Sequence, residues 1–592
     1  MMIKEDNTTK GNDEVQRWFS KITKAEQHYR DYHELIKKIR LYYRSELKAD
    51  KQNVFWSSVE TLKPFLYFKQ PKPYVERKDK SADKVQNYAC MILERALNWN
   101  LEQFDFDSVA KYARNDFLLS GMGLAIERYK PSFTVVENQQ KEDMEIKTDE
   151  RVETEYLDPL NFIADSEKVG IWEDCTWFAI RHHLTVKEAV ELFGADIEHR
   201  YPKDSQSISK VIEVYEIWDK SERKVLYLSR QFPEQFLKVI SEGLSLSNFY
   251  PIPKPILATT TNDSLIPVPD YVQIKPLLDE LDGVTARMEK TMKALKVSGC
   301  YDNAFPELAS ILNKEVTLVS VADFDRLKSA GGIKNIVDFM PIEQYITALQ
   351  ALALRRKDLI EAIYEITGVS DIMRGTSNSG DTATAVIKKT NFGTLRNQDR
   401  QNDMQRFISE IFKIKAEIIC EQFAADKLLS FLPENERYQP EAKAAVSLLK
   451  RDHLRGMILG VESDAWASES ETLKNNVTVV NTIHGLINQA FDVVSKQPLL
   501  LNLYRQMIAS LVATMPNARQ YDSVLEYCFD KITEEFNQPD APQSTMNLQQ
   551  QFIQLQNQKT LTELAIKKDQ NDIKRMELQL KYQNKNTNTS KQ

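Results

Sequence analysis

Three long stretches between residues 271 and 424 carry apolar residues at helical spacing, and they limit strongly what this chain can fold into. The stretches cover 271–298, 341–368 and 383–424. In the first, apolar residues recur at steps close to three and four, at Ile274, Leu278, Leu281, Met288, Met292 and Leu295. Helices of this length bury their apolar stripes against other elements. The spacing therefore predicts long helices that pack on one another and on the rest of the chain.

The segment that joins the second and third stretches almost spells a phosphate-binding loop. It reads DIMRGTSNSGDTATAVIKK and has the form G-x-x-x-x-G-D-T, with Asp381 where a P-loop has lysine. That lysine reaches the phosphates, whereas Asp381 would bring negative charge toward them. A P-loop also follows a strand, and the segment before this one has helical spacing. We therefore interpret Gly375, Thr376, Ser377, Asn378, Ser379 and Gly380 as a flexible loop between two helices, with Thr382 as a plausible N-cap of the second.

The first 270 residues predict helices followed by a β-rich part. Apolar spacing indicates helices over 13–50 and in the first half of 53–78, where prolines 71 and 73 end the second helix. Alternating segments follow, among them a hairpin that turns at Lys220 and Ser221. Five prolines within 251–269 mark a connector to the first long helix.

Beyond the third long helix the pattern becomes helical again and then weakens. Residues 455–466 indicate a strand, and 469–535 indicate further helices. From 548 onward apolar residues fill seven of ten positions of a heptad-like repeat, at Leu548, Phe552, Leu555, Ile566, Ile573, Met576 and Leu580. Asparagine and glutamine surround this repeat, which predicts a weak coiled coil or a disordered tail over 539–592.

Composition restricts the class of protein. The net charge of −8 argues against a protein that wraps nucleic acid with a basic surface. The five cysteines lie far apart without a C-x-x-C pair, which argues against a zinc ribbon or a disulfide framework and suits a reducing compartment. The N-terminus lacks the apolar core of a signal peptide, and the sequence has no apolar run that could span a membrane.

No catalytic or metal-binding pattern emerges from the residues. His182 and His183 are adjacent on a predicted strand, where neighbouring side chains point to opposite faces and cannot easily share one ion. Glu127 and Glu153 lie in strand-like segments, but carboxylate pairs arise by chance among 86 acidic residues. The glycines around Ser120 do not form G-x-S-x-G. The sequence therefore predicts neither an enzyme nor a cofactor.

The order of these elements resembles that of tailed-bacteriophage portal proteins, the head-to-tail connectors, of the short-tailed-phage type. Four local segments are similar to portal sequences, namely NVFWSSVETLKPFLYFKQPKPYV, DPLNFIAD, VYEIWDK and GVSDIMRG. The resemblance covers about residues 50–470. It implies a mainly helical α+β fold with an N-terminal wing at 1–270, stem helices at 271–298 and 341–368, and a clip at 299–340. It further implies a tunnel loop at 369–382, a long wing helix and return strand at 383–468, and a helical crown at 469–538.

The resemblance also implies a role and a set of partners. A portal is a ring, usually a dodecamer, at one vertex of the virion capsid, and it is assembled in the host cytoplasm. Double-stranded DNA enters and leaves through it during genome packaging and ejection. Its expected partners are other copies of itself, the terminase large subunit, a head-to-tail adaptor, and the major capsid and scaffolding proteins, with no membrane.

A few basic residues in an acidic chain suit a DNA conduit. Because each neutralised phosphate tightens binding steeply, a strongly basic bore would grip DNA instead of letting it slide. Candidate bore residues are Arg374, Lys388 and Lys389, and Lys328 and Lys334 lie in the clip-like segment that would contact the motor or adaptor. Each of these lysines fits a solvated helix face or loop equally well.

Two other functions remain open from the sequence. A P-loop-like NTPase motor rests only on GTSNSGDT and would hydrolyse ATP. A coiled-coil scaffold or adaptor rests on the repeat over 548–580 and would lose its oligomerisation when residues 540–592 are deleted.

Overall fold

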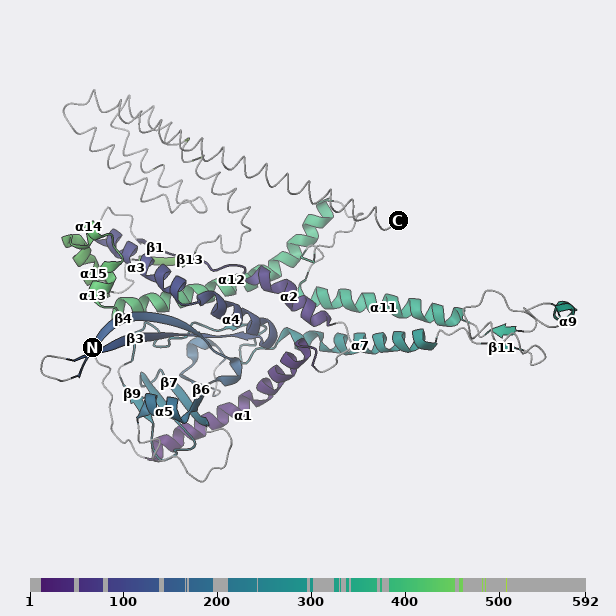
Figure 1. Ribbon diagram of the computed structural model, residues 1–592, viewed down its shortest axis with the longest axis horizontal. Helices are drawn as coiled ribbons and strands as arrows, with labels where there is room; N and C mark the ends of the chain where they lie inside the picture. Colours follow the sequence, from purple (N-terminus) through teal and green to yellow (C-terminus); the bar gives the residue numbers. More distant parts are fainter. Residues whose placement is uncertain are drawn as a thin grey trace. The chain divides into compact units, whose positions relative to one another are not determined.

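The structure is a computed structural model, and its described residues lie mostly between 12 and 461. They are 12–46, 53–77, 84–137, 143–165, 167, 170–194, 211–241, 243–294, 299–301, 324–329, 331, 337–339, 342–369, 373–374, 383–452, 457–461, 482, 485 and 507. The chain divides into the units Met1–Trp466 and Ala467–Gln592, and all elements described below belong to the first. Helices predominate over strands, so the predicted mainly helical α+β class is confirmed (Figure 1). The predicted crown and tail, 469–592, lie outside the described residues apart from three single positions.

The first helix, α1 (Asn12–Tyr43), lies against a five-stranded antiparallel sheet. The strands of this sheet follow one another in chain order as β5 (Phe162–Ala164), β6 (Trp177–Thr185), β7 (Val211–Asp219), β8 (Lys224–Leu228) and β9 (Lys238–Ile240). The buried residues of α1 recur at steps of three and four, as an amphipathic helix requires. All of them except Ile39 share one apolar core with aromatic side chains of the sheet. The predicted hairpin at Lys220 is confirmed by the pairing of β7 with β8.

Two short helical elements border this sheet. η1 (Pro159–Asn161) leads into β5, and the Asp158 side chain caps it by accepting from the Leu160 amide at 3.0 Å. α5 (Val186–Phe193) follows β6 and begins at a capping box formed by Thr185 and Glu188.

A second core joins α2 (Val54–Leu66), α4 (Phe106–Ser120) and the long helices. Asn53 caps α2 by accepting a hydrogen bond from the Trp56 amide at 2.8 Å. α4 ends at Gly121, whose φ of 78° is the left-handed conformation that glycine adopts readily. The short β2 (Met122–Gly123) follows and pairs with β10 (Ile256–Leu257).

The third core lies around α3 (Lys84–Gln103) and the helices that follow α12 (Ala383–Gln422). Those helices are α13 (Ala425–Ser430), α14 (Glu434–Arg437) and α15 (Pro440–Asp452). After α15 the chain returns as β13 (Met457–Val461), within the predicted strand at 455–466, and pairs antiparallel with β1 (Pro73–Arg77). Nearly four hundred residues therefore separate the two strands of this pair.

A long two-stranded ribbon packs against both α4 and α12. It consists of β3 (Ala125–Glu137) and β4 (Asp143–Tyr156), which pair antiparallel with an irregularity between Ser132 and Phe133. Buried residues at its base, including Ile126 and Val152, lie in the apolar cores described above. The ribbon thereby connects the sheet side of the unit to the long helix α12.

Candidate functional site: the α7–α11 helix pair and its attachment

Two long helices lie side by side and are antiparallel (Figure 1). α7 (Asp270–Ala294) occupies the stretch predicted as helix over 271–298, and α11 (Glu343–Thr367) occupies most of 341–368. Beyond α7, β11 (Gly299–Tyr301) pairs antiparallel with β12 (Val337–Phe339), which precedes α11. The short helix α9 (Phe324–Ser329) lies between these two strands in sequence.

The helix pair is fixed to the second core at one end of α7 and α11. Leu278 and Leu281 of α7 share that core with Leu359 and Ile363 of α11. Farther out, the Arg355 guanidinium contacts the Glu280 carboxylate through two hydrogen bonds of 2.9 and 3.0 Å. Both side chains are about half exposed, so this pair orients the helices more than it stabilises them.

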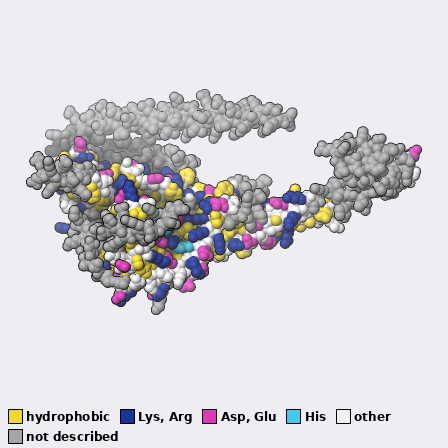
Figure 2. Space-filling view, turned by 60° about the horizontal axis from the view of Figure 1, so that its bottom comes forward, with side chains coloured by type: hydrophobic (Ala, Val, Ile, Leu, Met, Phe, Trp, Pro, Cys, Tyr) yellow, Lys and Arg dark blue, Asp and Glu magenta, His cyan; other side chains and the backbone are white. Residues whose placement is uncertain are grey.

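Large apolar side chains remain on the surface of this pair. Leu354 and Met292 are each 63% exposed, and Tyr345 and Ile346 are 40% and 45% exposed. Residues two positions apart on a helix point in directions that differ by ~200°. Leu354 therefore points away from the side occupied by the partly buried Leu352. α11 therefore carries one large apolar side chain, Leu354, on the side opposite its packed side, among polar neighbours such as Asp358 and Glu361. Figure 2 shows such hydrophobic side chains between basic and acidic ones along the pair.

A small set of contacts holds the end of α11 against α12. α11 stops at Gly368, whose φ is 75°, and the side-chain amide of Asn397 donates to the Gly368 carbonyl at 3.0 Å. Asn397 is completely buried. The Arg374 guanidinium stacks over the Tyr364 ring at 4.0 Å, and the Tyr364 hydroxyl lies 3.4 Å from the Ser57 hydroxyl of α2. The segment that leads toward the Gly/Ser loop is thus anchored on three helices.

The first described side chains of α12 are polar and make their contacts within the chain. Asn397 is buried, and Arg400 forms an ion pair with Asp270 at 2.7 Å in which both side chains are largely buried. Gln401 donates to the Phe65 carbonyl at 2.6 Å. Asn397 and Gln401 each meet the C-terminal end of another helix, where backbone carbonyls need donors.

The predicted site residues are only partly described. Arg374 is half-buried in the contacts above. Lys328 is exposed on α9, and its carbonyl accepts from the Gly331 amide at 3.1 Å. Lys388 and Lys389 lie within α12. The remaining predicted residues lie outside the described part of the chain, namely Gly375, Thr376, Ser377, Asn378, Ser379, Gly380 and Lys334, as does the predicted N-cap Thr382.

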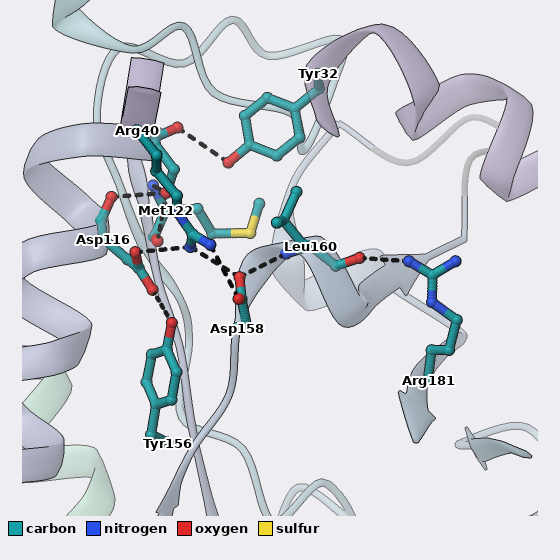
Figure 3. A network of polar contacts seen from close by, with 9 residues as sticks. Tyr32, Arg40, Asp116, Met122, Tyr156, Asp158, Leu160 and Arg181 are labelled. Atoms are coloured by element: carbon teal, nitrogen blue, oxygen red, sulfur yellow. Dashed lines mark hydrogen bonds and ion pairs between the residues drawn. The ribbon is translucent and has the colours of Figure 1, made fainter. Parts of the chain in front are cut away.

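A polar network connects α1, α4, β4 and η1 (Figure 3). Arg40 of α1 forms ion pairs with Asp116 at 3.0 Å and with Asp158 at 2.8 Å. The Tyr156 hydroxyl donates to Asp116 at 2.5 Å. Burial raises the pKa of Asp116 to about 6, in spite of the opposing effect of Arg40. This network lies in the apolar surroundings of the cores and fixes α1 relative to α4.

Two further buried ion pairs connect strands to other elements. Lys415 of α12 lies 2.9 Å from Glu127 of β3, and neither side chain is more than 2% exposed. Glu216 of β7 pairs with Arg128 at 2.5 Å and with His182 at 2.8 Å. Burial opposes the ionisation of Glu216, but Arg128 and His182 outweigh it and hold its pKa below the usual range. Glu127 and His182, weighed in the sequence as chemical groups, thus have structural roles, in an ion pair with Lys415 and in a hydrogen bond with Glu216.

Sequence reasoning missed Asn397, the Arg40 network and the Lys415 pair. One signal was available for Lys415, because it interrupts the apolar face of α12 between Phe412 and Ala416. A lysine within an apolar helical face requires a buried partner. Arg40, Asp116 and Asp158 offered no such signal, since they are far apart in sequence.

The described residues contain no group of three His, Cys, Asp or Glu side chains that could hold a metal ion. In the same residues, no helix has the length and apolarity needed to cross a bilayer. Three cysteines, Cys90, Cys175 and Cys420, are buried, and burial raises the pKa of each thiol. The candidate site is accordingly the exposed surface of the α7–α11 helix pair and the contacts that attach this pair to the rest of the chain.

Comparison with known proteins adds no relative. A scan against models of protein families finds no match to this chain, and a search of curated proteins finds no significant match.

Proposed function

We propose that this chain is a portal protein that forms a ring, with the α7–α11 helix pair as the seam between neighbouring copies. The observation that carries the proposal is that large apolar side chains, Leu354, Met292 and Ile346, remain exposed on this helix pair. Apolar side chains that stay exposed along one element mark a surface that another protein can cover. Repetition of one chain around an axis would cover that surface, with each pair contacting the next.

Two further features support the portal proposal. The first is the order of elements, in which an antiparallel helix pair with a small strand pair beyond it is followed by a short connection and a long helix. The second is the sequence resemblance, since three of its segments, at 53–75, 158–165 and 214–220, lie within described residues and form helix starts, turns and strands. In this proposal the ring sits at a capsid vertex of the virion and conducts double-stranded DNA.

The proposed partners follow from that role. The terminase large subunit and the head-to-tail adaptor would dock on the clip between α7 and α11, and capsid and scaffolding proteins would contact the outer surface of the ring. The P-loop alternative gains no support, because the element before the Gly/Ser loop is the helix α11 and not a strand.

The proposal is tested by the oligomeric state of the purified chain and of a charge-introducing variant. Wild-type protein should form rings with a central hole in negative-stain images and a matching mass in light scattering. Leu354→Glu should raise the protein concentration needed for ring formation at least about ten-fold. The reason is that burying one unpaired carboxylate in each seam costs more than ~1.4 kcal/mol.

Leu192→Glu is the matched control. Leu192 is 55% exposed on α5, so the same substitution there changes charge and size without touching the helix pair. Rings in this variant should form as in the wild type. A wild-type chain that stays monomeric under several salt conditions, or rings that persist unchanged in Leu354→Glu, would overturn the proposal.

A further inference from the structure

A groove of about 450 Å³ runs along α1 between that helix and the sheet. Its lining on α1 extends from Thr23 to Lys37, and its other wall comes from η1, β5, β6, β7 and Arg230. The fourteen steps from Thr23 to Lys37 span ~21 Å of helix. A single extended chain of about six residues, at ~3.3 Å each, matches its length.

The charges that line the groove are mixed but favour anions. Four basic and three acidic side chains line it, namely Arg30, Lys37, Arg181, Arg230, Glu26, Glu34 and Glu213. Glu26 is already paired with Arg230 at 2.5 Å. Glu26 and Glu213 also lie 2.7 and 2.8 Å from the Tyr215 hydroxyl, so both carboxylates are engaged within the chain. Arg230 is paired with Glu26 and Arg181 lies near Glu213, which leaves Arg30 and Lys37 facing the one remaining acidic lining residue, Glu34. Arg30 also lies 3.6 Å from Asp31 on the exposed surface, so the excess of positive charge is small.

Three exposed residues on α1 give this groove a charge order. Arg30, Glu34 and Lys37 follow one another at intervals of four and three residues, which places them ~6 and ~4.5 Å apart along the helix axis. Alternate residues of an extended chain are ~6.6 Å apart. Because lysine and arginine side chains are long and adjustable, they can make up the difference. The order base, acid, base on α1 thus fits the order acid, base, acid at every second position of an extended peptide.

The wall opposite α1 contributes two cations, Arg181 and Arg230. Arg181 of β6 donates to the Leu160 carbonyl at 2.9 Å, and its other terminal nitrogen lies 3.7 Å from Glu213. Nε of Arg181 and Nε2 of the nearby His33 are buried without a hydrogen-bond partner in the chain. Each side of the groove, α1 with His33 and the sheet with Arg181, therefore has one buried polar atom that the protein itself does not satisfy.

We propose that this groove binds an extended peptide segment of a partner protein with the pattern acid-x-base-x-acid. The two acidic side chains contact Arg30 and Lys37, and the basic side chain between them contacts Glu34. Arg181 faces the segment from the sheet side. This inference concerns a different surface from the α7–α11 pair, and it stands whether or not the chain forms a ring.

Fluorescence anisotropy of a labelled peptide tests the inference on the full chain. The probe is acetyl-TETKTET-amide, and its control, acetyl-TTEEKTT-amide, has the same composition without the alternation. Measurements belong at low ionic strength, because exposed charges are screened beyond ~10 Å at 0.1 M salt. The probe should bind saturably and the control at least about ten-fold more weakly, a difference that corresponds to ~1.4 kcal/mol.

Charge reversals locate the binding site. Arg30→Glu and Lys37→Glu should each weaken binding of the probe about ten-fold or more. Lys38→Glu is the matched control, because Lys38 is an exposed neighbour on α1 that does not line the groove. Glu34→Lys should weaken binding of the probe. The same variant should bind a peptide with glutamate at its central position more tightly than the wild-type chain does.

Three results would overturn the inference. One is the absence of saturable binding of the probe. Another is an equal loss of affinity in Lys38→Glu and Lys37→Glu, which would mark unspecific charge attraction. The third is saturation of the groove by succinate or inorganic phosphate alone with the same dependence on Arg30 and Lys37, which would identify a small anion as the occupant.

Discussion

The buried pair of Lys415 and Glu127 allows a quantitative test of how α12 is held to the β3–β4 ribbon. Lys415 Nζ lies 2.9 Å from the Glu127 carboxylate and donates to the Val152 carbonyl at 2.7 Å. The Thr154 hydroxyl donates to Glu127 at 2.7 Å. The Lys415 side chain is 2% exposed and that of Glu127 is 0% exposed. Each charge therefore depends on the other, and on two hydrogen bonds, for its solvation.

Lys415→Met should lower the free energy of unfolding by ~3–5 kcal/mol, because it leaves the Glu127 carboxylate buried without a counter-charge. Glu127→Gln should cost a similar amount, since the ammonium group then retains only a carbonyl and an amide. The double variant Lys415→Met, Glu127→Gln should regain most of the loss, because no charge remains buried. Replacing both members of a buried pair by neutral groups is often close to neutral in stability.

Urea unfolding followed by circular dichroism measures these free energies, and the double-mutant cycle gives the interaction between the two residues. Lys275→Met is the matched control. Lys275 pairs with Asp279 on the surface of α7, where both side chains are about half exposed, so its loss should cost less than ~1 kcal/mol. A cost below ~1 kcal/mol for Lys415→Met, or additive effects in the double variant, would refute the reasoning.

Three other predictions concern the core and the loop. Because burial raises the pKa of Asp116 to about 6, the folded state binds this proton more tightly than the unfolded chain, so its stabilising effect is present below about pH 4 and is lost as pH rises through 6. The stability difference between wild type and Asp116→Asn, measured by urea unfolding, should therefore fall by ~3 kcal/mol from pH 4 to 7, and a flat difference would contradict this. Gly123→Ala should destabilise the chain by ~1–3 kcal/mol, because a Cβ there would lie 2.6 Å from the Ala113 carbonyl oxygen. Gly283→Ala, in the open middle of α7, should instead raise the thermal midpoint through ~1 kcal/mol of helix propensity, and equal effects of the two would contradict this. Replacing residues 375–380 by a rigid proline-rich segment should leave rings intact in electron micrographs but impair DNA packaging, whereas normal packaging would reduce the segment to a linker.

Much of the helical part of the fold could be predicted from sequence, because the signal is local. Apolar residues at steps of three and four predicted helices where α7, α11 and α12 lie. The prolines at 71 and 73 located the end of α2 only coarsely, because the helix already ends at Leu66 and contains Pro64. The hairpin of β7 and β8 followed from alternation on both sides of a polar turn. These features depend on side-chain periods of 3.6 residues in helices and 2 residues in strands, and a short window of sequence is enough to show which period is present.

The candidate site was much less accessible to sequence reasoning. The basic residues of the candidate site were chosen for their position in sequence alone. Of these residues, the structure describes the side-chain surroundings of Arg374 and Lys328. The exposed apolar side chains of the helix pair, such as Leu354, could not be recognised, because an apolar residue in a helix looks like ordinary core until the packed side is known. The groove along α1 was equally hidden, since its two walls are more than a hundred residues apart.

The sequence by itself determined the period of each element, the places where helices end, and the absence of familiar catalytic patterns. Only the tertiary structure decided which polar residues became buried partners, as in Arg40 with Asp116 and Lys415 with Glu127. It also decided which apolar residues stayed on the surface, as at Leu354. The physical reason is that periodicity is encoded between neighbours along the chain. Burial and charge pairing depend on contacts between residues that folding brings together from distant positions.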